Sequence, residues 1–90
     1  MSHLRDDEAL VKRVRRIAGQ VAAIERALIG DADCATTLHL VAAARGAMNG
    51  LMDQIIEAHL RAHVAGPGLR DDERAQGAEE LIAAIRRYAK

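Results

Sequence analysis

The sequence between Asp33 and His63 has no proline and is rich in alanine, leucine, isoleucine and methionine, which predicts one long helix. A helix of about 30 residues is roughly 45 Å long. Six of its large apolar residues fall on one stripe less than about 100° wide. That stripe comprises Leu38, Val41, Met48, Met52, Ile55 and Ile56. The only cysteine, Cys34, and two histidines, His59 and His63, lie on the same stripe.

The length of this helix keeps Cys34 away from the two histidines of its own chain. On a straight helix Cys34 and His59 would be separated by about 37 Å. Two copies of the helix that pair antiparallel, crossing near Met48, would place Cys34 of one copy beside His59 and His63 of the other. A twofold axis would create this arrangement twice. We therefore expect an antiparallel dimer.

The rest of the chain predicts two further helices and no strand, so the fold class is all-α. The first helix is expected to begin at Asp6 or Asp7 and to end at Gly30-Asp31. Its apolar residues follow a heptad pattern, namely Leu10, Val14, Ile17, Val21, Ile24 and Leu28. Asp31 or Asp33 should cap the second helix. The second helix should end at Ala65-Gly66-Pro67-Gly68. A third helix should follow, capped by Asp71 or Asp72, and its apolar face comprises Ala78, Leu81, Ile82, Ile85 and Tyr88.

Size and composition narrow the class of protein. Ninety residues predict a single domain over residues 1–90, and a chain this short is commonly stabilised by oligomerisation. One cysteine allows no intrachain disulfide, which favours a cytoplasmic location. There is no signal-peptide pattern and no apolar run of about 18 residues, so no membrane partner is expected. The net charge is zero, so a nucleic-acid partner must be argued from local clustering.

Cys34, His59 and His63 are the candidate metal ligands. Two histidines four residues apart lie on one helix face and can bind one ion, and a thiolate adds a soft third ligand. His3 is a candidate fourth ligand, because the first residues have no helix signature. The alternative is a small buried cysteine with two histidines at an interface. Imidazoles in an apolar seam favour the metal, because buried polar groups need partners.

A basic run is the candidate DNA-binding surface. Lys12, Arg13, Arg15 and Arg16 are expected to project away from the apolar seam of the first helix. Such a strip can contact phosphates, or it can be an ordinary solvated face. Four basic residues within five positions, in a chain of zero net charge, favour DNA.

Arg45 is a charge within the apolar stripe, and it needs either solvent or a carboxylate such as Asp53 or Glu57 of a second chain. Two glycines, Gly46 and Gly50, lie on the opposite face of the same helix. Each costs about 1 kcal/mol there relative to alanine, which favours close approach of another helix.

Four stretches together resemble the CsoR/RcnR repressors: Arg13–Gln20, Gly30–Cys34, Ala42–Met52 and His59–His63. The resemblance implies a three-helix protomer, an antiparallel four-helix-bundle dimer and a dimer-of-dimers tetramer. It also implies a repressor that binds operator DNA without a helix-turn-helix and releases it when an effector binds. The family's basic DNA-contacting positions fall on Arg13 and Arg16.

The ligand positions of the family fall on His3, Cys34, His59 and His63, a set similar to that of the nickel/cobalt sensors. In those sensors N-terminal backbone donors complete the site, which makes the Ser2 amine a further candidate. The resemblance thus implies derepression of metal efflux or resistance genes by Ni(II) or Co(II), with Zn(II) also compatible. Copper sensors carry a second cysteine where this chain has His63, and thiolate-poor sites suit Cu(I) less well.

A formaldehyde-responsive repressor, with Cys34 as the reactive thiol, is the alternative within the family. Such members use an N-terminal proline and an acidic residue at the position of His63, whereas this chain has Ser2-His3 and His63. Persulfide sensing needs a second cysteine, which this chain lacks, so it is the least favoured effector within the family. Outside the family, a zinc hydrolase is a further alternative, but no carboxylate of this chain is obviously placed on the apolar stripe as a general base. A purely structural bundle would bind neither metal nor specific DNA.

Overall fold

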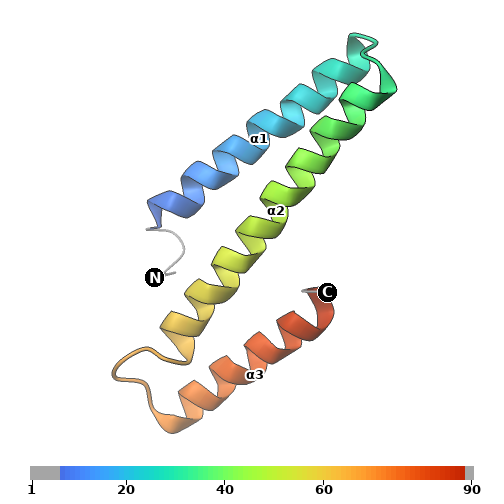
Figure 1. The fold of residues 1–90 in the computed structure, drawn as a ribbon. Coiled ribbons are helices and arrows are strands. Elements are labelled where there is room, and N and C mark those ends of the chain that lie inside the picture. The colour runs from blue at the N-terminus through green and yellow to red at the C-terminus, as the bar shows by residue number, and fades with distance from the viewer. Residues whose placement is uncertain (1–6, 89–90) are drawn as a thin grey trace. The chain divides into compact units, whose positions relative to one another are not determined.

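A computed structural model describes residues 7–88 and consists of three helices joined by two short connections (Figure 1). Helix α1 spans Glu8–Ile29, α2 spans Cys34–His63 and α3 spans Asp71–Tyr88. No strand occurs within residues 7–88. The predicted all-α, three-helix protomer is confirmed. None of the three helices is long and apolar enough to cross a membrane.

The beginning of α1 follows from the capping residue expected there. Asp7 is the N-cap in an extended conformation, and its carboxylate accepts a hydrogen bond from the backbone amide of Leu10 at 3.2 Å. This bond satisfies one of the amides that the first turn leaves unpaired.

The end of α1 confirms the predicted stop at Gly30-Asp31. Gly30 is the C-cap, but its φ is −83°, and the residue with positive φ is Asp31 at 60°. The amide of Ala32 donates to the carbonyl of Ala27 at 2.9 Å, which is the long hydrogen bond of a Schellman motif. Aspartate tolerates the left-handed region better than most residues, so it can close this helix.

The second connection confirms the predicted stop but corrects the predicted caps of α3. Helix α2 ends at His63, and Gly68 has a positive φ of 80°. Asp71 is itself the first helical residue. The backbone amide of Arg70 donates to the carboxylate of Glu73 at 2.9 Å, so the cap is the acidic residue of the first turn reaching back.

Contacts divide the described chain into two units that meet within α2, residues 7–51 and residues 52–88. In the first, α1 runs antiparallel to the beginning of α2; in the second, α3 folds back along the end of α2 (Figure 1). Leu10 and Ile17 are the only buried large apolar residues within 7–88. Each unit is therefore a helical hairpin with little core of its own.

The apolar seam of α1 is divided between buried and exposed positions. Leu10 and Ile17 are buried and Ile24 is half-buried, whereas Val14, Val21 and Leu28 are 49%, 53% and 68% exposed. On α2, no residue is buried, and Leu38, Val41 and Met48 are exposed. The protomer thus leaves one line of its heptad and much of the α2 stripe uncovered.

Candidate metal and DNA sites

The basic run lies on α1, but its four members are not equivalent. Lys12, Arg15 and Arg16 are exposed, as expected for a strip facing away from the seam. Arg13 is half-buried, which corrects the expectation that it projects with the other three. The reason is helical spacing, because Arg13 lies three residues after Leu10 and four before Ile17, at the border of the buried line.

Gly50 of α2 makes room for the side chain of Arg13. A Cβ at Gly50 would lie 2.6 Å from Nη1 of Arg13 and 3.3 Å from Cζ. The close approach expected at this glycine is therefore present, and it comes from the guanidinium on α1. At Gly46 nothing lies within 4 Å of a Cβ, so that glycine has no such explanation within the protomer.

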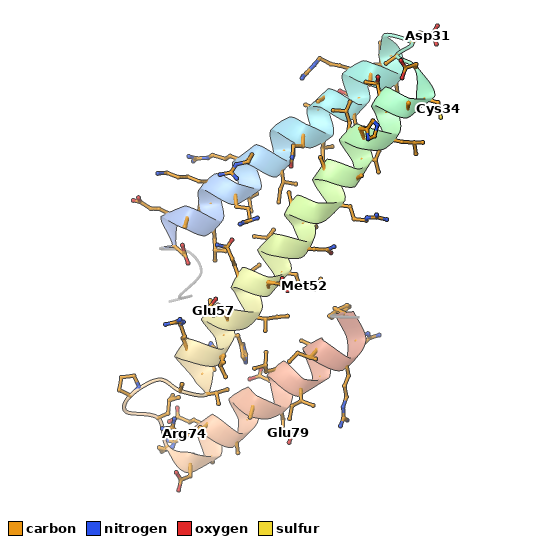
Figure 2. All side chains as sticks on the ribbon, viewed as in Figure 1. Asp31, Cys34, Met52, Glu57, Arg74 and Glu79 are labelled. Carbon is orange, nitrogen blue, oxygen red and sulfur yellow. The ribbon has the colours of Figure 1, made fainter. Side chains whose placement is uncertain are left out.

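Cys34 is the first residue of α2 and is exposed (Figure 2). The preceding residue, Asp33, caps the helix, because its carboxylate accepts from the amide of Thr36 at 2.7 Å. Hydrogen bonds from the backbone amide and then the side chain of Thr36 lower the pKa of Asp33 below its ordinary value. The cysteine is thereby held in a defined first turn, with its thiol open to a partner.

His59 and His63 lie together near the end of α2. Their ring centroids are 4.7 Å apart with an interplanar angle of 43°. His59 is half-buried and His63 is exposed. His59 Nε2 is 3.0 Å from the carbonyl oxygen of Gly77 in α3, and a carbonyl can only accept, so Nε2 carries the hydrogen. The two imidazoles expected to share a metal are thus neighbours.

The remaining residues singled out in the sequence are not assembled into a site within residues 7–88. Ser2 and His3 lie outside the described residues. Among residues 7–88, no group of three or more histidine, cysteine or acidic side chains is arranged to hold a metal ion. Arg45 is exposed, while Glu57, one of its suggested partners, pairs with Arg61 at 2.7 Å.

The sequence matches the model of the metal-sensitive transcriptional repressors over residues 6–87. The chain belongs to this repressor family. Its members are transcriptional regulators that bind operator DNA, and the repressor described here is accordingly not an enzyme. The family resemblance noted in the sequence is confirmed.

Three relatives show how closely the repressor follows the family. It is 36% identical over its whole length to the transcriptional repressor RcnR of Salmonella arizonae. It is 46% identical over its whole length to an uncharacterised Serratia marcescens protein from the region 5′ of bioA. A solved structure of the formaldehyde-responsive regulator FrmR from Salmonella enterica serovar Typhimurium, in a glutamate-to-histidine variant, has a TM-score of 0.85 and 42% identity, covering 93% of this chain and 94% of that one.

Sequence reasoning missed two residues of the repressor's C-terminal unit. Gly77 is buried within α3. Arg74, which is labelled in Figure 2, donates to the backbone carbonyls of Val64 and Leu69. A glycine inside a predicted helix is a signal of close packing, and it was available at Gly77 as it was at Gly46 and Gly50. For Arg74 the sequence offered no comparable signal.

Proposed function

We propose that this repressor binds operator DNA in its apo form and releases it on binding Ni(II) or Co(II), so that genes for metal efflux or resistance are expressed. The observation that supports this most directly is the neighbouring pair of imidazoles at His59 and His63. Imidazole nitrogens suit Ni(II), Co(II) and Zn(II), and Zn(II) remains a compatible effector. As a regulator of operator DNA, the protein would act in the cytoplasm.

The donor set requires two chains. His59 and His63 come from one protomer and the exposed Cys34 from the beginning of the partner's α2. His3 and the Ser2 amine would complete the set, as the family resemblance implies. When bound, the metal supplies a link between these donors that the apo protein lacks. The fit is supported by the chemistry of the donors and by their exposure, since Cys34 and His63 are both exposed.

The exposed apolar residues support the antiparallel assembly that this site needs. Met48, at the predicted crossing point, is 48% exposed, and Leu38 and Val41 are exposed on the same stripe. Burying apolar surface contributes about 25 cal/mol per Å², so covering the stripe with a second α2 would stabilise a dimer. We propose such a dimer, paired again as a tetramer, in which residues 1–90 of each chain act as one domain.

DNA recognition is assigned to α1. Lys12, Arg15 and Arg16 are exposed cations, and Arg13 lies at the edge of the same face. In an oligomer this strip would be repeated by symmetry, which multiplies phosphate contacts and makes binding dependent on salt. Effector binding must differ between the two states of the assembly by about 1–3 kcal/mol or more to change operator occupancy usefully.

Formaldehyde is the second candidate effector, and one comparison favours it. The solved relative is a formaldehyde-responsive regulator, and it is 42% identical to this chain. That relative is itself a variant with histidine in place of one glutamate. This chain has histidine at His63, where the resemblance places an acidic residue in formaldehyde sensors. We therefore rank metal first.

The decisive experiment compares operator affinity with and without effector. DNA selected from a random pool by the apo protein is titrated with protein alone, with one Ni(II) per protomer, and with formaldehyde. We expect Ni(II) to weaken binding at least about 10-fold, a change of about 1.4 kcal/mol. Equal affinities with and without Ni(II) would rule the metal hypothesis out, and release by formaldehyde alone would establish the alternative.

The Cys34→Ala variant is the matched control for that experiment. It should bind the selected DNA as tightly as the unmodified protein, because Cys34 lies away from the basic strip on α1. It should no longer release the DNA when Ni(II) is added. Retention of a full response without the thiol would show that Cys34 is not a ligand.

A further inference from the structure

His59 is fastened to α3 by one of its two ring nitrogens. Nε2 donates to the carbonyl oxygen of Gly77, 3.0 Å away, and the ring is half-buried. A neutral imidazole carries one hydrogen, so this contact places it on Nε2 and leaves Nδ1 as the nitrogen with a free lone pair. The backbone of α3 thereby decides which nitrogen of His59 can bind an effector.

Gly77 can make this contact because it has no side chain. A Cβ at this position would overlap the carbonyl oxygen of His63 and would lie 2.8 Å from its carbonyl carbon and 2.9 Å from its Cβ. Backbone atoms of a helix cannot move aside as a flexible side chain could. Any larger residue would therefore push α3 away from the end of α2.

Arg74 ties the beginning of α3 to the connection that precedes it. Its guanidinium donates to the carbonyl of Val64, the residue after His63, and to the carbonyl of Leu69 at 3.4 Å. The connection between the two helices is thus tied to α3 one turn before Gly77. Together these contacts fix the position of the Gly77 carbonyl relative to the His59 ring.

We propose that Gly77 is a positioning residue of the effector site, which holds His59 in the Nε2–H tautomer so that Nδ1 is the ligating nitrogen. This inference rests on the proposed function for the identity of the effector. Carbonyl and carboxylate partners of this kind orient ligating histidines, and removing them typically weakens metal binding by about 10–100-fold. The backbone carbonyl of Gly77 performs this role, and glycine is required because a side chain at this position would clash with His63.

The tautomer can be measured directly on the unmodified protein. Long-range ¹H–¹⁵N spectra of ¹⁵N-histidine-labelled apo protein report which nitrogen of His59 carries hydrogen. We expect Nε2–H in the apo protein, and with Zn(II) as a diamagnetic probe we expect the metal at Nδ1 with the Nε2 hydrogen retained. An Nδ1–H tautomer, or Zn(II) bound through Nε2, would overturn the inference.

The two proposals fail in different ways in this experiment. If Zn(II) and Ni(II) do not bind at all, the proposed metal response fails, whereas the apo tautomer still decides whether Gly77 holds His59. If the metals bind through Nε2, the metal response stands and the role of Gly77 is wrong.

Gly77→Ala provides the second test. It should populate both tautomers of His59 and weaken Zn(II) affinity by about 10–100-fold. Gly19→Ala is the matched control, because nothing lies within 4 Å of a Cβ at that helical glycine and its affinity should not change. Equal affinity and an unchanged tautomer in a folded Gly77→Ala protein would contradict the proposal. If Gly77→Ala does not fold, the spectra of the unmodified protein decide alone.

Discussion

Asp31 carries the backbone strain of the connection between α1 and α2. Its φ of 60° lies in the left-handed region, where a Cβ costs about 1–2 kcal/mol for most residues and where glycine is not penalised. We expect Asp31→Gly to be more stable than Asp31→Ala by about 1 kcal/mol. Urea unfolding of the two variants at equal protein concentration would measure this, and equal midpoints would show that the turn relaxes.

Asp33 makes the beginning of α2 sensitive to acid. Its pKa in the folded protein is lowered chiefly by the hydrogen bond from the amide of Thr36. The stabilisation is therefore fully present above the ordinary pKa of an aspartate and is lost as the pH falls through the lowered value. Asp33→Asn can still cap the helix but cannot titrate. We expect the variant to have a shallower acid limb in a plot of stability against pH.

That acid limb should be followed by the circular dichroism of unfolding between neutral pH and the most acidic pH at which the protein folds. Glu25→Gln, which removes an exposed carboxylate from the interior of α1, serves as control. Indistinguishable acid limbs for Asp33→Asn and the unmodified protein would mean that the cap does not contribute to the pH dependence.

At the scale of the element, α1 combines a packing side with the basic side proposed to contact DNA, and Arg13 lies between them. Arg13→Ala should weaken operator binding and reduce the magnitude of the salt slope by about 1, as expected for one lost phosphate contact. Fluorescence anisotropy at several salt concentrations would measure the slope. Arg86→Ala removes the same charge from the exposed side of α3 and should leave the slope unchanged. An unchanged slope in Arg13→Ala would limit this residue to its packing against Gly50.

The elements themselves were predictable because their signals are local. Asp7, Asp33 and the stop after His63 follow from capping and helix-breaking chemistry that acts within a few residues. The neighbouring rings of His59 and His63 follow from helical spacing alone. The contacts of Arg13 with Gly50 and of His59 with Gly77 join residues far apart in sequence, so periodicity could not assign them. The left-handed Asp31 was missed because glycine is the usual choice there.

At the scale of the whole molecule, the part of the chain that the structure describes buries only two large apolar side chains, which argues that folding depends on association. Met48→Glu would place a carboxylate at the proposed crossing of two α2 helices. An unpaired charge there should weaken association by about 3 kcal/mol or more. Sedimentation velocity should show smaller species, and the unmodified protein should melt at higher temperature as its concentration is raised.

His39→Glu is the control for that change, because His39 is exposed on α2 away from the apolar stripe. It should leave the sedimentation coefficient unchanged. A Met48→Glu protein that sediments and melts like the unmodified one would remove the proposed interface from consideration.

The uncovered half of the α1 heptad has a bearing on gene dosage. Val14, Val21 and Leu28 contribute to stability only after another surface covers them. A newly made chain would then become stable only by associating with other copies. Operator occupancy would therefore rise more steeply than in proportion to the amount of protein synthesised. Cells making little of this regulator would leave its target genes expressed even without an inducer.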